Sequence, residues 1–334
     1  MNLFIGISIA VIIGFLFLAF YRFIRWRKGL FRRLNNGRIT ETDRGKIEYV
    51  CIGEGPTVLL LHGSMGGWDQ GILIADGLDL VKHGFTVVSP SRPGYARTPI
   101  EVGKTPEAAA DAMAVLLDNL NIKTVIVFGF SGGGPTALQF TLRHPNYTQA
   151  LVMFAAISGQ QVQPERTTER FGWLIFSKYS IWLLDMIVWF MTGIARLFPS
   201  WTIKLLFNST ANENFRTQEE LEHIMKHSKQ VASLQKLIQL NSPFSIRKPG
   251  LDNDLKTVVH LPVYPLEHIT CPTLVVHGRA DGNVPFSHAE FVVGTIPNAE
   301  MYVVENGGHF LWTGSGADQM QSVIINFLKD NSGK

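Results

Sequence analysis

The segment TVIVFGFSGGG at residues 124–134 limits the possible folds more than any other part of the chain. A mostly apolar run ends there, and Gly129, Ser131 and Gly133 fill a GxSxG pattern ahead of a helix expected at 134–143. A serine on a sharp turn between a strand and a helix needs neighbours without bulky side chains, and the turn holds its hydroxyl above the sheet. The pattern therefore predicts that Ser131 is a nucleophile in an α/β fold, with a glycine-rich turn of no chemical importance as the alternative.

The rest of the chain continues the strand and helix alternation that this turn requires. Short apolar runs are separated by polar stretches, some of helix length, which is typical of a mostly parallel sheet. Strands are expected at 46–52, 57–61, 85–89, 124–128, 150–154, 273–277 and 301–304, and helices at 106–120, 134–143 and 317–328. A length of 334 residues with 46% hydrophobic content is ample for a buried core.

A serine hydroxyl is a weak nucleophile near neutral pH, so it needs a base, and the base needs an acid that holds it in one tautomer. His309, in ENGGHF, follows the last expected strand, and Asp281, in HGRADGNVP, follows the strand before it. The chain order Ser, Asp, His is the one expected for a serine on such a turn. Ser131, Asp281 and His309 are therefore the predicted catalytic residues. The alternatives for the acid are Asp252, Asp254 and Glu305.

Acyl transfer also needs hydrogen-bond donors for the oxyanion that forms on the substrate carbonyl. The glycines of LLLHGSMGG, after the strand at 57–61, let backbone N–H groups turn inward. We expect the amide of Ser64, with Met65 as the alternative, to act together with the amide of Gly132. His62 is expected to brace the loop.

The N-terminus carries a second signal. Residues 3–20 contain no charged side chain and form a helix that nearly crosses a hydrocarbon core of about 30 Å. Residues 1–21 are predicted to be a transmembrane anchor, and 22–44 a basic juxtamembrane segment that binds anionic headgroups. A cleaved signal peptide is the alternative, although no basic region precedes the run. The positive-inside bias puts the following domain in the cytoplasm.

The charge and cysteine content exclude other classes. The net charge of +3 is small and the basic excess gathers near the anchor, so a nucleic-acid partner is not expected. Cys51 and Cys271 match no metal-ligand spacing or disulfide framework and are interpreted as small buried residues.

The strand rhythm stops between residues 158 and 268, which are predicted to form a helical cap. The aromatic-rich stretch 171–198 either packs on the main domain or touches lipid. A second transmembrane helix is disfavoured because Asp185 lies in the middle of the best apolar run.

The motifs HGSMGG, SRPGYARTP, GFSGGGPTALQFTLRHP, HGRADGNVP and GGH together resemble the α/β-hydrolase superfamily, in the branch with esterases, monoacylglycerol-lipase-like enzymes and cofactor-free haloperoxidases. The resemblance implies an eight-stranded, mostly parallel sheet, with a core at 45–157 and 269–330. The missing eighth strand is expected between residues 65 and 82. Phe130 departs from the histidine of many members, at a position that shapes the pocket floor.

The expected function is hydrolysis of a carboxylic ester with an apolar acyl chain, through an acyl-enzyme on Ser131 that water releases with the help of His309. This chemistry requires no metal and no organic cofactor. The same three residues also serve acyltransferases, thioesterases, aminopeptidases, carbon–carbon hydrolases and haloperoxidases, so the sequence does not rank these. A non-catalytic protein that binds an apolar ligand is the alternative from a different class.

Overall fold

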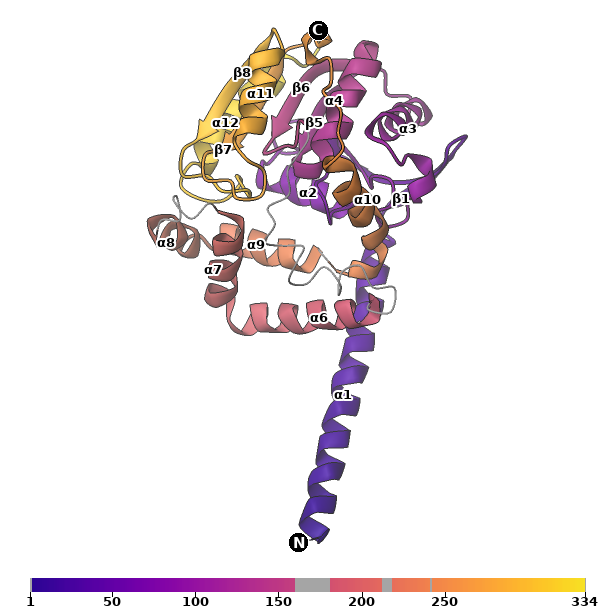
Figure 1. Ribbon diagram of the computed structural model, residues 1–334, viewed down its shortest axis with the longest axis vertical. Coiled ribbons are helices and arrows are strands. Elements are labelled where there is room, and N and C mark those ends of the chain that lie inside the picture. The colour runs from indigo at the N-terminus through magenta and orange to yellow at the C-terminus, as the bar shows by residue number, and fades with distance from the viewer. Residues whose placement is uncertain (1, 160–180, 212–217, 241, 334) are drawn as a thin grey trace.

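The computed structural model describes residues 2–159, 181–211, 218–240 and 242–333 (Figure 1). Eight strands form one sheet in the order β1-β2-β4-β3-β5-β6-β7-β8. β2 is antiparallel to β1 and β4, and the other neighbours are parallel. The strands are β1 Arg38–Thr42, β2 Gly45–Ile52, β3 Thr57–Leu61, β4 Thr86–Pro90, β5 Val125–Phe130, β6 Thr148–Phe154, β7 Thr273–Gly278 and β8 Ala299–Val304. The expected eight-stranded, mostly parallel sheet is confirmed.

The position expected for the eighth strand is wrong. Residues 65–82 contain the helix α2, Trp68–Gly77, and the additional strand is β1, which forms a hairpin with β2. β1 reads RITET and lies at the edge of the sheet with three of its five residues exposed, so it carries no apolar run. The sheet therefore begins at Arg38, inside the segment 22–44 that was expected to be only juxtamembrane.

Helices cover both faces of the sheet. One face is covered by α2 and by α12 (Ala317–Asp330). The other face is covered by α3 (Pro106–Asn119), α4 (Gly134–Arg143) and α11 (Ser287–Thr295). β3 shows why both faces are apolar: Val58 and Leu60 pack with α2, and the alternate Leu59 and Leu61 pack with α3 and α4. The carboxyl ends of the parallel strands are left free to carry loops.

Most of the described residues between β6 and β7 are helical. The helices are α6 Ile181–Leu197, α7 Pro199–Thr210, α8 Gln218–Lys226, α9 Ser228–Leu240 and α10 Lys248–Val258. Buried residues of α7, α8 and α9 join the core on the α2 side. α10 packs on the core itself, where the Gly250 amide donates to the Gly94 carbonyl at 2.8 Å. The first part of the aromatic-rich stretch, 171–180 with Trp173, lies outside the described residues.

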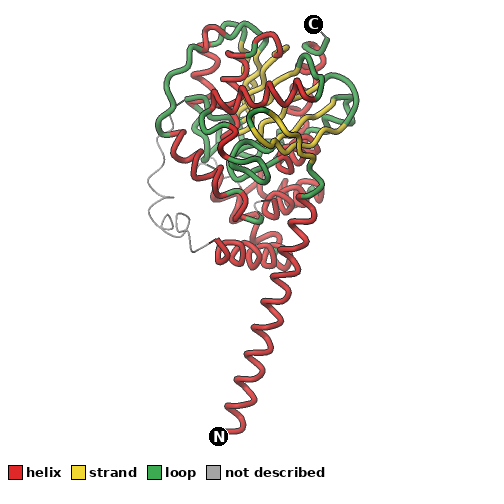
Figure 2. The backbone as a smooth tube through the Cα atoms, turned by 90° about the vertical axis from the view of Figure 1, so that its right-hand side faces the viewer, coloured by secondary structure: helices red, strands yellow, loops and turns green. Residues whose placement is uncertain are grey.

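The N-terminal helix α1, Asn2–Leu34, is longer than the expected anchor at 1–21 (Figure 2). Residues 4–21 are largely exposed, and the helix is long and apolar enough to cross a membrane. Its last turns instead pack on the domain, with Phe23, Leu30 and Leu34 buried. The basic stretch after residue 21 is therefore a continuation of the same helix.

α1 is joined to α6, a helix between β6 and β7, by an ion pair that is buried on the α6 side. Arg27 Nε donates to Asp185 Oδ2 at 2.9 Å, and the Asp185 side chain is fully buried. Its carboxylate also accepts from the amide and the hydroxyl of Ser245, at 3.1 and 3.0 Å. The Phe23 and Trp189 rings meet edge to face, with centroids 5.9 Å apart. The carboxylate in the second turn of this apolar helix is thus neutralised by a residue of α1.

Candidate active site

Ser131 lies at the turn between β5 and α4, with φ at +50°. A non-glycine residue in this left-handed region is strained and is held there by its surroundings. A Cβ on Gly129 would lie 2.7 Å from Ala137 Cβ, and one on Gly133 only 2.3 Å from the Leu61 carbonyl oxygen. Both glycines are therefore required by close packing, which explains the GxSxG pattern around Ser131.

The structure brings Ser131, His309 and Asp281 together from three loops at the carboxyl edge of the sheet. His309 Nε2 lies 3.0 Å from Ser131 Oγ, and His309 Nδ1 lies 2.8 Å from Asp281 Oδ2. His309 and Asp281 are 4% and 5% exposed, whereas Ser131 is half-buried. The second oxygen of Asp281 accepts from the amides of Asn283 and Val284, at 2.8 and 2.9 Å. This arrangement can hold the imidazole in the tautomer that accepts a proton from the serine.

The alternative acids lie elsewhere. Glu305 pairs with Arg279 at 3.1 Å on the surface, and Asp252 pairs with Lys248. Asp254 forms an ion pair with Arg92. Asp281 is the carboxylate that contacts His309.

The expected oxyanion donors lie beside the serine. A Cβ on Gly132 would lie 3.1 Å from the Ser64 amide nitrogen, so the two backbone segments are in contact. The Met65 amide lies near the Tyr95 hydroxyl, whereas the part of the chain that the structure describes offers no acceptor to the Ser64 amide. Of the two candidates in this loop, Ser64 therefore has the amide that is free for a ligand.

His62 holds the base of this loop. Its Nε2 accepts from the Arg92 amide at 2.9 Å, so the proton is on Nδ1, which donates to the Gly63 carbonyl at 2.7 Å. Burial and the nearby Arg92 hold the pKa of His62 well below its usual value. The ring is neutral and joins the loops after β3 and β4, which agrees with the expected bracing role.

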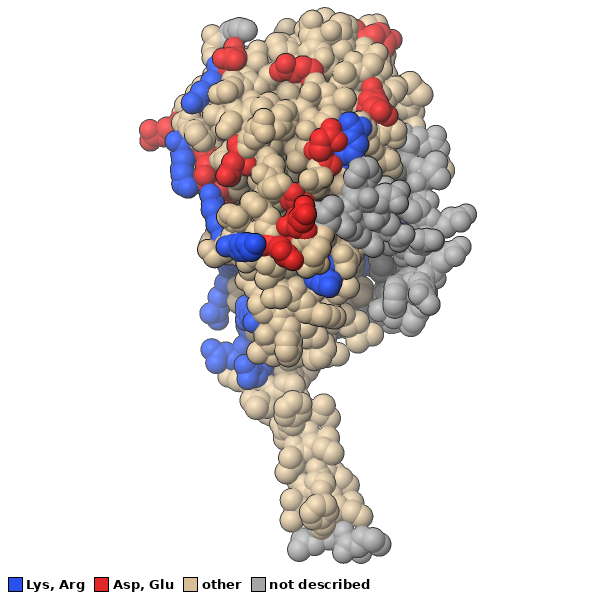
Figure 3. All heavy atoms as spheres, turned by 90° about the vertical axis from the view of Figure 1, so that its left-hand side faces the viewer, with Lys and Arg blue, Asp and Glu red and all other residues tan. Residues whose placement is uncertain are grey.

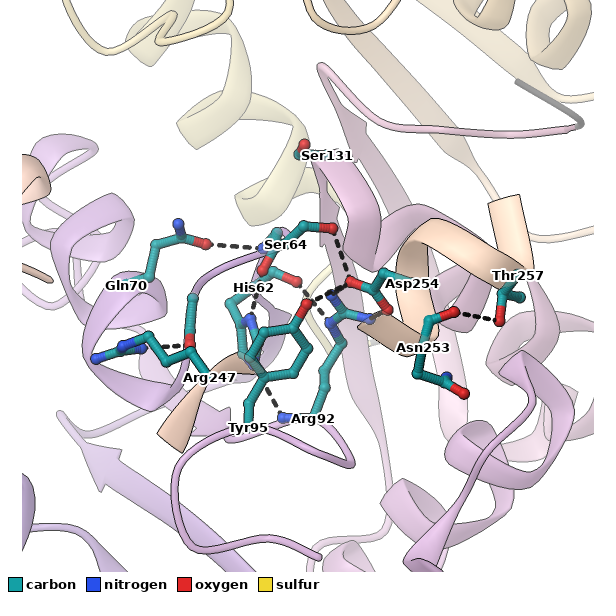
Figure 4. A network of polar contacts seen from close by, with 12 residues as sticks. His62, Ser64, Gln70, Arg92, Tyr95, Ser131, Arg247, Asn253, Asp254 and Thr257 are labelled. Carbon is teal, nitrogen blue, oxygen red and sulfur yellow. Dashed lines mark hydrogen bonds and ion pairs between the residues drawn. The ribbon is translucent and has the colours of Figure 1, made fainter. Parts of the chain in front are cut away.

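The sequence alone did not reveal the polar network behind the Ser64 loop (Figure 4). Arg92 donates to both oxygens of Asp254, at 3.1 and 2.6 Å, and Tyr95 donates to Asp254 at 2.6 Å. Ser64 Oγ donates to the same carboxylate at 2.7 Å. Burial, followed by Asp254, raises the pKa of Tyr95 well above its usual value, so the phenol stays protonated. The network fixes the side chain of Ser64, whose amide nitrogen lies against Gly132.

A second buried arginine supports the other end of the same loop. Arg247 is fully buried, donates to the Gly66 carbonyl and pairs with Asp69 at 2.7 Å. Arg92 and Arg247 are therefore each neutralised by a protein carboxylate.

The described walls beside His309 are aromatic and apolar. The Phe130 ring centroid lies 5.2 Å from that of His309, and the Phe310 and Trp312 rings lie 5.5 Å apart next to it. A cavity reaches from His309 to Leu206 and Phe207 of α7. Among the described residues, no group of three or more His, Cys, Asp or Glu side chains is placed to hold a metal ion.

His288 provides a pH test of the loop where the cap begins. Its Nδ1 accepts from the Ser158 amide at 3.1 Å, and burial lowers its pKa to about 4. Between pH 6.5 and 4, His288 binds a proton in the unfolded chain but stays neutral in the folded chain. The free energy of unfolding therefore decreases by about 3 kcal/mol as the pH is lowered from 6.5 to 4. Asparagine keeps an acceptor for the Ser158 amide but does not titrate. We therefore expect His288→Asn to lack this part of the pH dependence of the free energy of unfolding. Denaturant unfolding at pH 7 and pH 4 measures it, and an equal loss of stability in variant and wild type would contradict it.

The chain matches the family model described as "alpha/beta hydrolase fold" over residues 56–312. It is 26% identical to the uncharacterized hydrolase YcgS of Bacillus subtilis over 86% of this chain and 96% of that protein. It is 27% identical to 2-hydroxy-6-oxo-6-phenylhexa-2,4-dienoate hydrolase of Comamonas testosteroni, over 87% and 95%. The solved α/β hydrolase fold protein from Nakamurella multipartita superposes with a TM-score of 0.77 at 28% identity, over 88% and 99% of the chains.

Proposed function

Because the chain belongs to the α/β-hydrolase fold family, we propose that it is a serine hydrolase of carboxylic esters with Ser131 as its nucleophile. The observation that carries this proposal is the continuous hydrogen-bonded line from Ser131 through His309 to Asp281, at 3.0 and 2.8 Å. Each of the three side chains in this line is within hydrogen-bond distance of the next.

The geometry supports a two-step reaction. Ser131 Oγ attacks the ester carbonyl as its proton moves to His309 Nε2, and the amides of Ser64 and Gly132 stabilise the oxyanion. His309 then gives this proton to the leaving alcohol. Water, deprotonated by His309, attacks the acyl-enzyme, releases the carboxylic acid and restores the Ser131 hydroxyl. Asp281 stabilises the imidazolium in both steps.

The aromatic and apolar walls around His309 favour an apolar acyl group. Carbon–carbon hydrolysis, the activity named for the Comamonas relative, is the second candidate, supported by 27% identity along most of both chains. A dienoate carries a carboxylate that needs a cationic partner. Near the described site Arg92 and Arg247 are already paired with Asp254 and Asp69. This pairing favours a neutral ester.

We propose that α1 anchors the enzyme as a single span with the catalytic domain in the cytoplasm. The exposed cations Arg22, Arg25, Lys28 and Arg32 follow directly after the apolar run. Figure 3 shows Lys and Arg gathered where α1 leaves the domain and none along the stem below. This distribution suits anionic headgroups on the inner side of a membrane.

A substrate panel on the full chain in detergent tests the proposed activity. We expect kcat/KM for a medium-chain ester to exceed that for the matching acetate by about tenfold or more, because each buried methylene contributes roughly 0.8 kcal/mol. Equal rates on both esters would remove the argument for an apolar acyl group. Faster turnover of a 2-hydroxy-6-oxodienoate than of every ester would favour the carbon–carbon hydrolase.

A further inference from the structure

The cap helices α6 and α7 expose a group of large apolar side chains. Four of them are spaced three or four residues apart on α6 and so share one face of that helix. Two more lie at the bend between α6 and α7, and the last two lie on α7. The members, named here the outer cap face, are Leu183, Met186, Ile187, Phe190, Leu197, Phe198, Trp201 and Leu205, each between 40% and 75% exposed. Single exposed apolar residues are common, but such a continuous group marks an interaction surface.

The orientation of the outer cap face is set by α1. In Figure 1 the axis of α6 runs across that of α1, and α7 turns from its end toward the sheet. The Arg27–Asp185 ion pair and the Phe23–Trp189 contact fix this crossing. If α1 crosses a bilayer, α6 therefore lies along the plane of the membrane.

The depth of this crossing matches the membrane surface. The exposed run of α1 at residues 4–21 covers roughly 27 Å at 1.5 Å per residue, close to the thickness of a hydrocarbon core. The contacts with α6 begin immediately after it, at Phe23 and Arg27, beside the exposed Arg22 and Arg25. In a bilayer crossed by α1, the α6 part of the outer cap face therefore lies at the boundary between headgroups and acyl chains, and α7 rises from there toward the sheet (Figure 1).

α7 links this face to the catalytic residues. Trp201 and Leu205 point outward, while Leu206, Phe207 and Thr210 of the same helix line the cavity that reaches His309. The end of α7 is held on the Asp281 loop, where the Gly282 amide donates to the Thr210 carbonyl at 2.9 Å. One helix thus lies between the outer cap face and the cavity beside His309.

We propose that the outer cap face docks in the bilayer interface and that the substrate is a single-chain lipid ester that enters the site from the membrane. The proposal rests on the proposed function and on the span by α1. It adds a second membrane contact, parallel to the surface, and it names the substrate class.

The first experiment measures depth in vesicles and does not depend on catalysis. In the full chain, Cys51 and Cys271 are replaced by alanine and Phe190 by cysteine, and the new cysteine is labelled with an environment-sensitive fluorophore. The labelled protein is placed in vesicles of phosphatidylcholine and phosphatidylglycerol. We expect strong quenching by nitroxide near the headgroup and weaker quenching by nitroxide near the acyl-chain end. The matched control is Val263→Cys, another apolar position that is 85% exposed, outside the outer cap face, where lipid should not quench. No lipid quenching at residue 190 overturns the proposal, and stronger deep quenching overturns it in favour of a second span.

The second experiment measures access. We expect Phe190→Asp combined with Trp201→Asp to lower the rate on a monoacylglycerol within the vesicle by about tenfold while the rate on a water-soluble acetate ester stays within twofold. Val263→Asp should leave both rates unchanged. Equal losses on both esters would indicate a damaged cap and contradict lateral entry. A wild type that cleaves neither ester rejects the proposed function and leaves the depth measurement valid.

Discussion

Ser131→Ala is expected to abolish labelling by a fluorophosphonate probe and to lower kcat for any ester by about 10⁴-fold or more. The probe reacts only with a serine whose proton has an acceptor, and His309 Nε2 is that acceptor at 3.0 Å. Serine and alanine both carry a Cβ, so the strain at a φ of +50° is present in both proteins. The substitution therefore removes the oxygen and leaves the backbone unchanged.

The matched control is Ser209→Ala, which removes an exposed hydroxyl that bonds the Leu206 carbonyl of its own helix. This variant should label as the wild type does. Labelling that persists in Ser131→Ala would place the reactive serine elsewhere and remove the proposed mechanism. A folded wild type that never labels would favour a binding protein on the same scaffold.

Asp254→Ala is expected to lower the free energy of unfolding by about 3–5 kcal/mol, because it leaves the Arg92 charge buried and unpaired. Arg92 is 5% exposed and bonds both oxygens of Asp254. The same change frees Ser64 Oγ and the Tyr95 hydroxyl, so we also expect kcat to fall in the fraction that remains folded. Chemical denaturation and ester hydrolysis measure the two effects.

A neighbouring variant and a double variant separate these effects. Asn253→Ala, on the same helix but uncharged and only half-buried, should cost about 1 kcal/mol through the lost bond to the Lys104 carbonyl. Arg92→Met combined with Asp254→Leu should regain stability, because no buried charge is left, but should not regain activity, because Ser64 loses its partner. Full activity in this double variant would contradict a positioning role for the network.

The expected residues Ser131, Asp281 and His309 could be found from sequence because each follows a strand that is visible as an apolar run. Loops after parallel strands meet at one edge of the sheet, so chain order was enough to bring them together. β1 was missed because an edge strand with polar, exposed residues carries no such run.

Long-range ionic contacts were not predictable in the same way. Arg92 and Asp254 lie 162 residues apart, and Arg27 and Asp185 lie 158 apart, with no local pattern that joins them. A usable signal was present at Asp185, since a carboxylate in the middle of an apolar helix needs a cation. In the sequence Asp185 disfavours a second span, but no local pattern indicates that Arg27 neutralises it.

The unbroken path of α1 into the packed domain has a kinetic consequence. A flexible linker lets a catalytic domain tumble and sample the solution around its anchor, but a continuous helix whose last turns are buried fixes the height and the tilt of the domain. For a chain held in a bilayer in this way, encounters with substrate occur by lateral diffusion at constant depth. The rate should then follow the mole fraction of substrate in the leaflet and not its bulk concentration, so diluting the substrate with inert lipid at fixed total amount should slow turnover.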